Sequence, residues 1–232
     1  MNSTQKQARI AGLLYFLVGI TAPIGLVYVP GKLIVSGDAT ATADRLRASE
    51  WLLRVGMGSE LFHQVIGIFL VLALYRLFKA VNETLAVHMV VLSLVPVAIM
   101  FLNVLNEIAA LLLVTGTSYL AVFEQPQRDA LALMFLRLHD RGITVASIFW
   151  GLWLFPFAML VIRSGFIPRV LGYLMMIAGV AYLASAATTL LMPQYAKLVG
   201  QYAMILEIGE VPIIFWLLIW GARTRPAEAR AS

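Results

Sequence analysis

Cysteine is absent from the 232-residue chain, and charged side chains make up only 12% of it. The absence of cysteine excludes disulfide frameworks, thiolate metal ligands, cysteine nucleophiles and lipidated cysteines. The chain also lacks a phosphate-binding glycine loop, a Gly-x-Ser-x-Gly nucleophile turn and a His-Glu-x-x-His zinc motif. Because soluble globular domains carry about twice this share of charge, the composition argues against a soluble fold.

What the chain does contain is apolar sequence, at 61% hydrophobic residues and a mean hydropathy of +0.89. A membrane-spanning helix needs about 20 mostly apolar residues. Runs of this kind lie at about residues 10–30, 51–75, 84–114, 142–162, 170–191 and 199–220. The sequence therefore predicts an all-α integral membrane bundle of about six transmembrane helices. We expect this bundle to form a single transmembrane helical domain over 1–222, followed by a polar C-terminal tail over 223–232.

Two connections carry further predictions. Residues 39–50 form a possible short surface helix between the first two spans. The apolar stretch 131–138 is too short to span a membrane. We therefore place this stretch, together with the charged run that follows it, before the fourth span. The first apolar run is longer than the core of a signal peptide, which favours a retained first helix over a cleaved leader.

Basic residues decide the expected topology. The net charge of +5 does not indicate nucleic-acid binding, because the 17 basic residues stand at the ends of apolar segments and form no stripe. Nine of them share the side of the two termini and eight lie opposite, but the nine stand in very short segments flush with helix ends. Basic residues placed in this way determine orientation most strongly. We expect a multi-pass membrane protein with both termini in the cytoplasm and membrane lipid as its surroundings.

Ionisable residues interrupt several of the apolar runs or stand at their ends. Each costs at least about 2.5–3.5 kcal/mol on insertion scales, so each is a functional candidate by default. Counting about 1.5 Å per residue from the cytoplasmic helix ends places all of them in the outer half of the bilayer. The candidates are Glu60, His63, Glu107, His139, Glu207 and Glu210, with Asn103 and Asn106 as supporting polar residues.

Carboxylates and histidines on facing helices are the ligands of metal centres in helical bundles. We predict all six ionisable candidates as metal ligands, with Glu60, His63 and Glu107 as catalytic residues. The cofactor is a divalent transition metal, zinc or iron, and the substrate is lipid-like or a small apolar molecule. The motif itself is weak, because only one Glu-x-x-His occurs.

Two alternatives to the metal-dependent enzyme stay open at this point. The first is a non-enzymatic transport, binding or scaffold protein, in which the paired Glu207 and Glu210 handle protons or cations. In the second, the polar groups only pair across helices and fix their packing. The oligomeric state has no signature in the sequence.

Several stretches of the chain resemble one family of bacterial membrane proteins, the "domain of unknown function 4386". They are Ala11–Thr21, Glu60–Gln64, Leu102–Glu107, Phe149–Pro156 and Arg163–Gly172. The resemblance runs from about Arg9 to Gly221. It implies a small multi-pass inner-membrane protein and supplies no activity.

Overall fold

The computed structural model describes residues 3–222, and all regular structure within them is helical. Six helical segments in this range are long and apolar enough to cross a membrane, namely Thr4–Leu33, Glu50–Phe78, Glu83–Thr115, Gln125–Ser164, Arg169–Leu191 and Pro193–Trp220. The predicted all-α bundle with six spans is therefore confirmed. The predicted polar tail lies outside the described residues.

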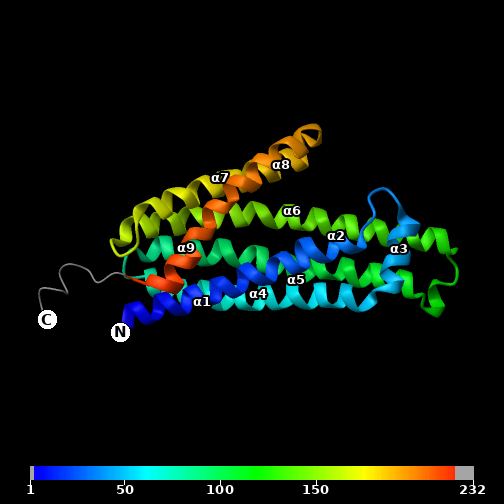
Figure 1. Cartoon of the computed structure of the whole chain (residues 1–232), viewed down its shortest axis with the longest axis horizontal. Helices are drawn as coiled ribbons and strands as arrows, with labels where there is room; N and C mark the ends of the chain where they lie inside the picture. Colours follow the sequence, from blue (N-terminus) through cyan, green and yellow to red (C-terminus); the bar gives the residue numbers. More distant parts are fainter. Residues whose placement is uncertain (1–2, 223–232) are drawn as a thin grey trace, which may run out of the picture. The chain divides into compact units, whose positions relative to one another are not determined.

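Two of the six spans change their helical type along their length. In chain order the elements labelled in Figure 1, together with the short π and 3-10 segments, are α1 (Ser3–Pro23), η1 (Ile24–Tyr28), α2 (Val29–Leu33), α3 (Ala39–Ala48), α4 (Glu50–Phe78), α5 (Glu83–Thr115), η2 (Ser118–Leu120), α6 (Gln125–Ser164), α7 (Arg169–Leu191), α8 (Pro193–Glu207), η3 (Ile208–Glu210), α9 (Val211–Phe215) and η4 (Trp216–Trp220). The first span is α in its two ends and π-helical in the middle. The last passes through a 3-10 turn and ends in a π-helical turn.

The π-helical segment of the first span follows Pro23. Proline lacks an N–H donor, so it interrupts the hydrogen-bond ladder of the helix and releases carbonyl groups around it. Two side chains of α4 bond carbonyl oxygens of the preceding turn: Ser59 Oγ donates to Thr21 at 2.9 Å, and His63 Nδ1 lies 3.2 Å from Val18. These bonds tie α4 to the first span at the interruption.

The short surface helix predicted at 39–50 is present as α3. Its first turn is capped by Asp38, whose side chain accepts a hydrogen bond of 2.9 Å from the backbone N–H of Ala41. Arg47 in its last turn forms an ion pair with the buried Asp129 of α6 and donates to the carbonyl oxygen of Val114 in α5 at 3.2 Å. These bonds hold α3 against the adjoining ends of α5 and α6 (Figure 1).

The fourth span begins earlier than the sequence predicts. We separated residues 131–138 and the charged run after them from a span starting at residue 142, whereas α6 is continuous from Gln125 to Ser164. The charged run does not break the helix because it contains no proline and its charges pair along the helix, with Arg137 and Asp140 at 3.5 Å. His139 therefore lies within a long helix and not at a helix start.

The chain forms two compact units. One takes in Met1–Leu17, Ile66–Val97 and Thr144–Ser232, and the other Val18–Val65 and Ala98–Ile143. We refer to them as the first and the second unit. The helices α1, α4, α5 and α6 contribute to both. In the first unit, α7 and α8 pack against each other as a hairpin that turns at Met192. The second unit contains α3 and an apolar core that includes Leu46, Leu53 and Leu136.

Candidate metal centre

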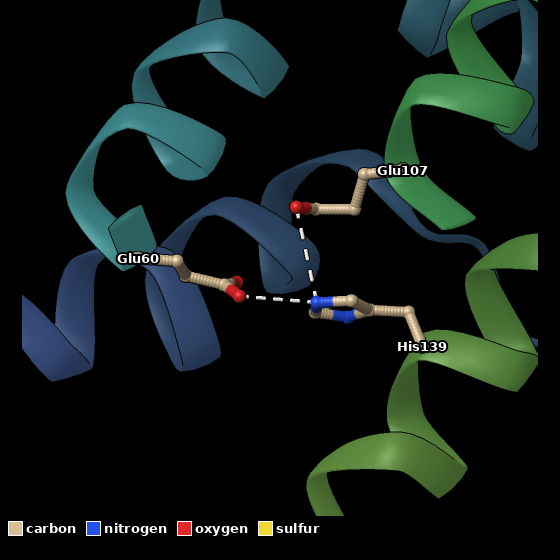
Figure 2. A group of neighbouring side chains, drawn as sticks. All are labelled: Glu60, Glu107 and His139. Carbon is tan, nitrogen blue, oxygen red and sulfur yellow. Dashed lines mark hydrogen bonds and ion pairs between the residues drawn. The ribbon is translucent and has the colours of Figure 1, made fainter. Parts of the chain in front are cut away.

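Three acidic or imidazole side chains meet inside the second unit. Glu60 extends from α4, Glu107 from α5 and His139 from α6, and Figure 2 shows them pointing toward one another. His139 Nε2 lies 3.1 Å from Glu60 Oε2 and 3.8 Å from Glu107 Oε2. One ligand atom from each residue lies within 4.8 Å of the other two, and all three residues are buried. We call these three residues the candidate metal centre, or the metal centre for short.

The distances suit a shared metal ion. Zinc bonded to nitrogen and oxygen at about 2.1 Å in tetrahedral geometry holds neighbouring ligand atoms ~3.4 Å apart. The two distances from His139 Nε2, 3.1 and 3.8 Å, lie on either side of this value. The ligand atoms of Glu60 and Glu107 lie at most 4.8 Å apart, so the three residues could bond one ion after side-chain shifts.

The electrostatics of the centre also call for a cation. Glu60 and Glu107 are each 2% exposed and His139 is 3% exposed. When both carboxylates are ionised, the cluster carries surplus negative charge whether the ring is neutral or protonated, and buried unpaired charge is costly. Within residues 3–222, Glu60 Oε1 and Glu107 Oε2 have no hydrogen-bond partner. A divalent cation would compensate the charge and bond these oxygens.

The π-helical turn of the first span supports Glu60. Gly25 lies in this turn, and a Cβ at its position would lie 2.5 Å from Glu60 Cγ and 3.1 Å from the carbonyl oxygen of Gly56. No other residue fits there without moving Glu60. The absence of a side chain at Gly25 therefore allows Glu60 to lie against the first span while its carboxylate reaches His139.

A second close approach supports His139. Asn103 Nδ2 on α5 donates a hydrogen bond of 2.9 Å to the backbone carbonyl of His139, and Asn106 Nδ2 lies 3.1 Å from Asn103 Oδ1. A Cβ on Gly142, one helical turn beyond His139, would lie 2.0 Å from Asn103 Oδ1. Gly142 therefore lets α5 and α6 approach closely, and the two predicted supporting asparagines lie beside the centre.

A small cavity of about 10 Å³ adjoins two of the three residues. Glu107, His139 and Asp140 contribute its polar wall, and the rest of the lining is apolar: Val29, Pro30, Leu33, Ile34, Leu46, Leu53 and Leu136. A cavity of roughly 10–15 Å³ holds about one water molecule. The centre thus has room on one side for about one water molecule.

The other predicted ligands lie elsewhere. His63 follows Glu60 by three residues on α4, but its ring bonds the carbonyl of Val18. Glu207 and Glu210 belong to the first unit, where the carboxylate of Glu210 accepts hydrogen bonds from the hydroxyls of Tyr15 and Tyr182. Among the described residues, the group whose ligand atoms lie close enough to hold a metal ion contains three of the six predicted ligands.

Several residues around the centre were not identified from the sequence. Gly25 and Gly142 stand where segments far apart in the chain approach each other closely. The sequence around a glycine in an apolar run does not indicate such a contact. Asp129 and Arg47 pair over 82 positions of sequence. The one available signal was that Asp129 and Arg47 both stand beside predicted spans and have opposite charge.

Comparison with known proteins relates this chain to a family. An uncharacterized protein of Archaeoglobus fulgidus is 28% identical over 169 residues, which cover 69% of this chain and 85% of that protein. No solved structure matches the chain. The profile of the family described as "Domain of unknown function (DUF4386)" matches residues 10–221, a range that contains Glu60, Glu107 and His139. Since the match takes in nearly all of the described residues, the chain belongs to the DUF4386 family.

Proposed function

We propose that Glu60, Glu107 and His139 bind one divalent transition metal ion, zinc or iron, and that this centre catalyses a reaction on a lipid-like or small apolar substrate. The observation that carries the proposal is the convergence of three buried ligand atoms within 4.8 Å, with two carboxylate oxygens that lack a partner among the described residues. A packing role alone would favour a neutral and fully bonded cluster.

The donor set favours zinc or iron. Imidazole nitrogen suits zinc and iron, whereas calcium and magnesium take oxygen ligands, usually six or more. Catalytic zinc sites combine three protein ligands with one position open to water or substrate. Here the centre offers three protein ligands, and the cavity beside Glu107 and His139 supplies the space for a fourth partner.

The metal, the glutamates and the apolar residues of the cavity would have different roles in a reaction. A metal bound there would act as a Lewis acid and activate water or a substrate carbonyl or phosphoryl group. Each glutamate has two oxygens, so an oxygen that does not bond the metal is available to accept a proton from the attacking group. The apolar residues of the cavity keep bulk water away and favour a substrate with an apolar part next to its reacting group.

The position in the membrane is part of the same proposal. Glu60 stands ten residues from the start of α4 and Glu107 eight residues before the end of α5, at helix ends that our topology assigns to the outside. This supports a centre in the outer half of a bacterial inner membrane, with both termini in the cytoplasm. Labelling of single cysteines, which can be introduced freely because the chain has none, would test the orientation.

Metal analysis of the purified protein tests the proposal. The full chain is purified in detergent without chelator from cells supplied with zinc and iron, and its metal content is measured by mass spectrometry. We expect about one ion per chain, and loss of this ion in His139→Ala, Glu60→Gln and Glu107→Gln.

His63→Ala is the matched control, because it removes a histidine from the same unit that bonds only a backbone carbonyl. It should keep its metal. The proposal is wrong if the natural protein holds no stoichiometric metal after supplementation, or if His139→Ala keeps as much as His63→Ala.

A further inference from the structure

A charged face of α6 lies beside the metal centre. Arg137 and Asp140 have side chains that are 48% and 41% exposed, and Arg141 is exposed as well. They stand at positions i, i+3 and i+4, so they share one face of the helix. This face directly precedes the apolar run at 142–162 in a helix of 40 residues, which is longer than a membrane span requires.

The level of this face is fixed by the hydrogen bond between Asn103 and the carbonyl of His139. At that level α5 exposes Leu102, which is 68% exposed, and Leu105, which is 57% exposed. Further toward the end of α5, Ile108 and Leu112 are exposed too. The neighbouring helix therefore presents an apolar, lipid-type surface both level with the charged face and beyond it.

The helix α4 also presents an apolar surface at the level of the charged face. Glu60 of α4 contacts His139, and the residues that follow it, Leu61 and Phe62, are exposed. Charged side chains that face lipid at this depth are costly and need compensation. The second unit thus has one face of α6 that suits a polar, charged partner in a belt that otherwise suits hydrocarbon.

The charges of this face define the partner. Two guanidinium groups stand beside one carboxylate, so the face carries a net positive charge. The ion pair between Arg137 and Asp140 is long, at 3.5 Å, and Arg141 makes no hydrogen bond or ion pair to any residue of the described range. Arginine binds phosphate through two parallel N–H donors, which makes it the preferred residue for phosphate recognition.

The charged face is continuous with the cavity of the metal centre. Asp140 belongs to both, and Leu136, one position before Arg137, also lines the cavity. A ligand with a phosphate bound at Arg137 and Arg141 would therefore have its adjoining part at the mouth of an apolar cavity that ends at Glu107 and His139. A lipid with an anionic headgroup has this combination of groups.

We propose that Arg137 and Arg141 bind the phosphate of an acidic phospholipid in the outer half of the bilayer, and that this lipid is the substrate class of the metal centre. The substrate assignment rests on the proposed function, whereas the lipid-binding site can be tested without it. Free phosphate and a second copy of the chain are the competing occupants of this face.

The experiment measures lipid binding by the full chain in detergent micelles, with a fluorescently labelled phosphatidylglycerol as the probe. Unlabelled phosphatidylglycerol, phosphatidylcholine and inorganic phosphate compete in separate arms. The test variant is the double substitution Arg137→Gln and Arg141→Gln, which removes both positive charges and keeps polar side chains of similar helix propensity. The control is Arg54→Gln, which removes an exposed arginine of α4 that pairs with Glu50.

We expect the double variant to bind phosphatidylglycerol about 30-fold more weakly, which is a loss of about 5.5-fold for each arginine, and the control to bind it normally. Phosphatidylcholine and inorganic phosphate should compete poorly. Equal binding by the double variant and the control, equal competition by phosphatidylcholine, or full competition by inorganic phosphate would overturn the proposal. A double variant that changes its oligomeric state and keeps its lipid affinity would do so as well.

A further arm separates this inference from the metal centre. His139→Ala is expected to lose metal and keep its affinity for phosphatidylglycerol, whereas the double arginine variant should keep its metal. If the natural protein binds no metal but shows the arginine-dependent lipid binding, the proposed function fails and the lipid site stands. If metal binds and the arginines have no effect on lipid binding, the lipid site fails and the proposed function stands.

Discussion

Replacing Gly142 with alanine is expected to disrupt the contact between α5 and α6 beside the metal centre. The new Cβ would lie 2.0 Å from Oδ1 and 2.4 Å from Cγ of Asn103, which is a short and buried side chain. Overpacking of this kind costs about 1–3 kcal/mol. Displacing Asn103 also breaks its hydrogen bond to His139, which adds about 0.5–1.5 kcal/mol. We expect the free energy of unfolding to fall by about 2–4 kcal/mol.

Thermal unfolding in detergent, followed by the fluorescence of the five tryptophans, measures this effect. The control is Gly58→Ala in α4, because nothing lies within 4 Å of a Cβ there and alanine is the better helix former. An Asn103→Ala background removes the group that the new Cβ meets, so the cost of Gly142→Ala should largely disappear in it. The reasoning is refuted if Gly142→Ala is as harmless as the control, or equally costly in both backgrounds.

Three further substitutions test other parts of the structure. Gly25→Ala should displace Glu60 and lower metal affinity about 10–100-fold, measured by titration of the metal-free protein; unchanged affinity would contradict the close approach. Arg47→Ala should lower the free energy of unfolding by about 3–5 kcal/mol, because it leaves Asp129 buried without its cation, and Asp129→Asn in the same chain should recover part of the loss. Glu210→Leu should cost about 1–3 kcal/mol for each tyrosine hydroxyl that loses its acceptor while metal content stays constant; loss of metal would instead make Glu210 a ligand.

The fold was predictable because the bilayer constrains it so strongly. Apolar runs of sufficient length located all six spans, and the turn chemistry around Asp38 located α3. The start of α6 was missed, because a charged run such as 137–141 resembles a loop when only hydropathy is considered. A helix tolerates such a run wherever its charges pair along one face, as those of Arg137 and Asp140 do.

The sequence predicted the residue types of the three-residue group and a common level for them along the helices, but not which residues belong to the group. Spacing along a helix placed His63 on the same face as Glu60, yet three positions still separate two side chains by about 60° around the axis. That rotation directs His63 to a backbone carbonyl of the first span while Glu60 reaches His139. Depth counted along each helix contains no information on which helices are neighbours. Glu207 and Glu210, which lie with Tyr15 and Tyr182 in the first unit, could not be separated from the centre for this reason.

Two sets of buried carboxylates within the second unit show how the chain treats charge. Asp129 is compensated by Arg47, whose guanidinium also bonds Asp44 and a backbone carbonyl, so this carboxylate is balanced by protein groups alone. Glu60 and Glu107 share one imidazole, and each retains an oxygen without a partner in the described range.

If the centre served packing alone, the same balancing by arginine would be expected in both places. The contrast therefore predicts different responses to a chelator. Removing metal should lower the unfolding temperature of the natural protein and of Arg47→Ala by the same amount, because the two sites share no partner and their effects add. It should leave His139→Ala unchanged, because that variant has no metal to lose. Equal chelator sensitivity in all three proteins would show that the two glutamates are balanced by some other means and that metal acts elsewhere.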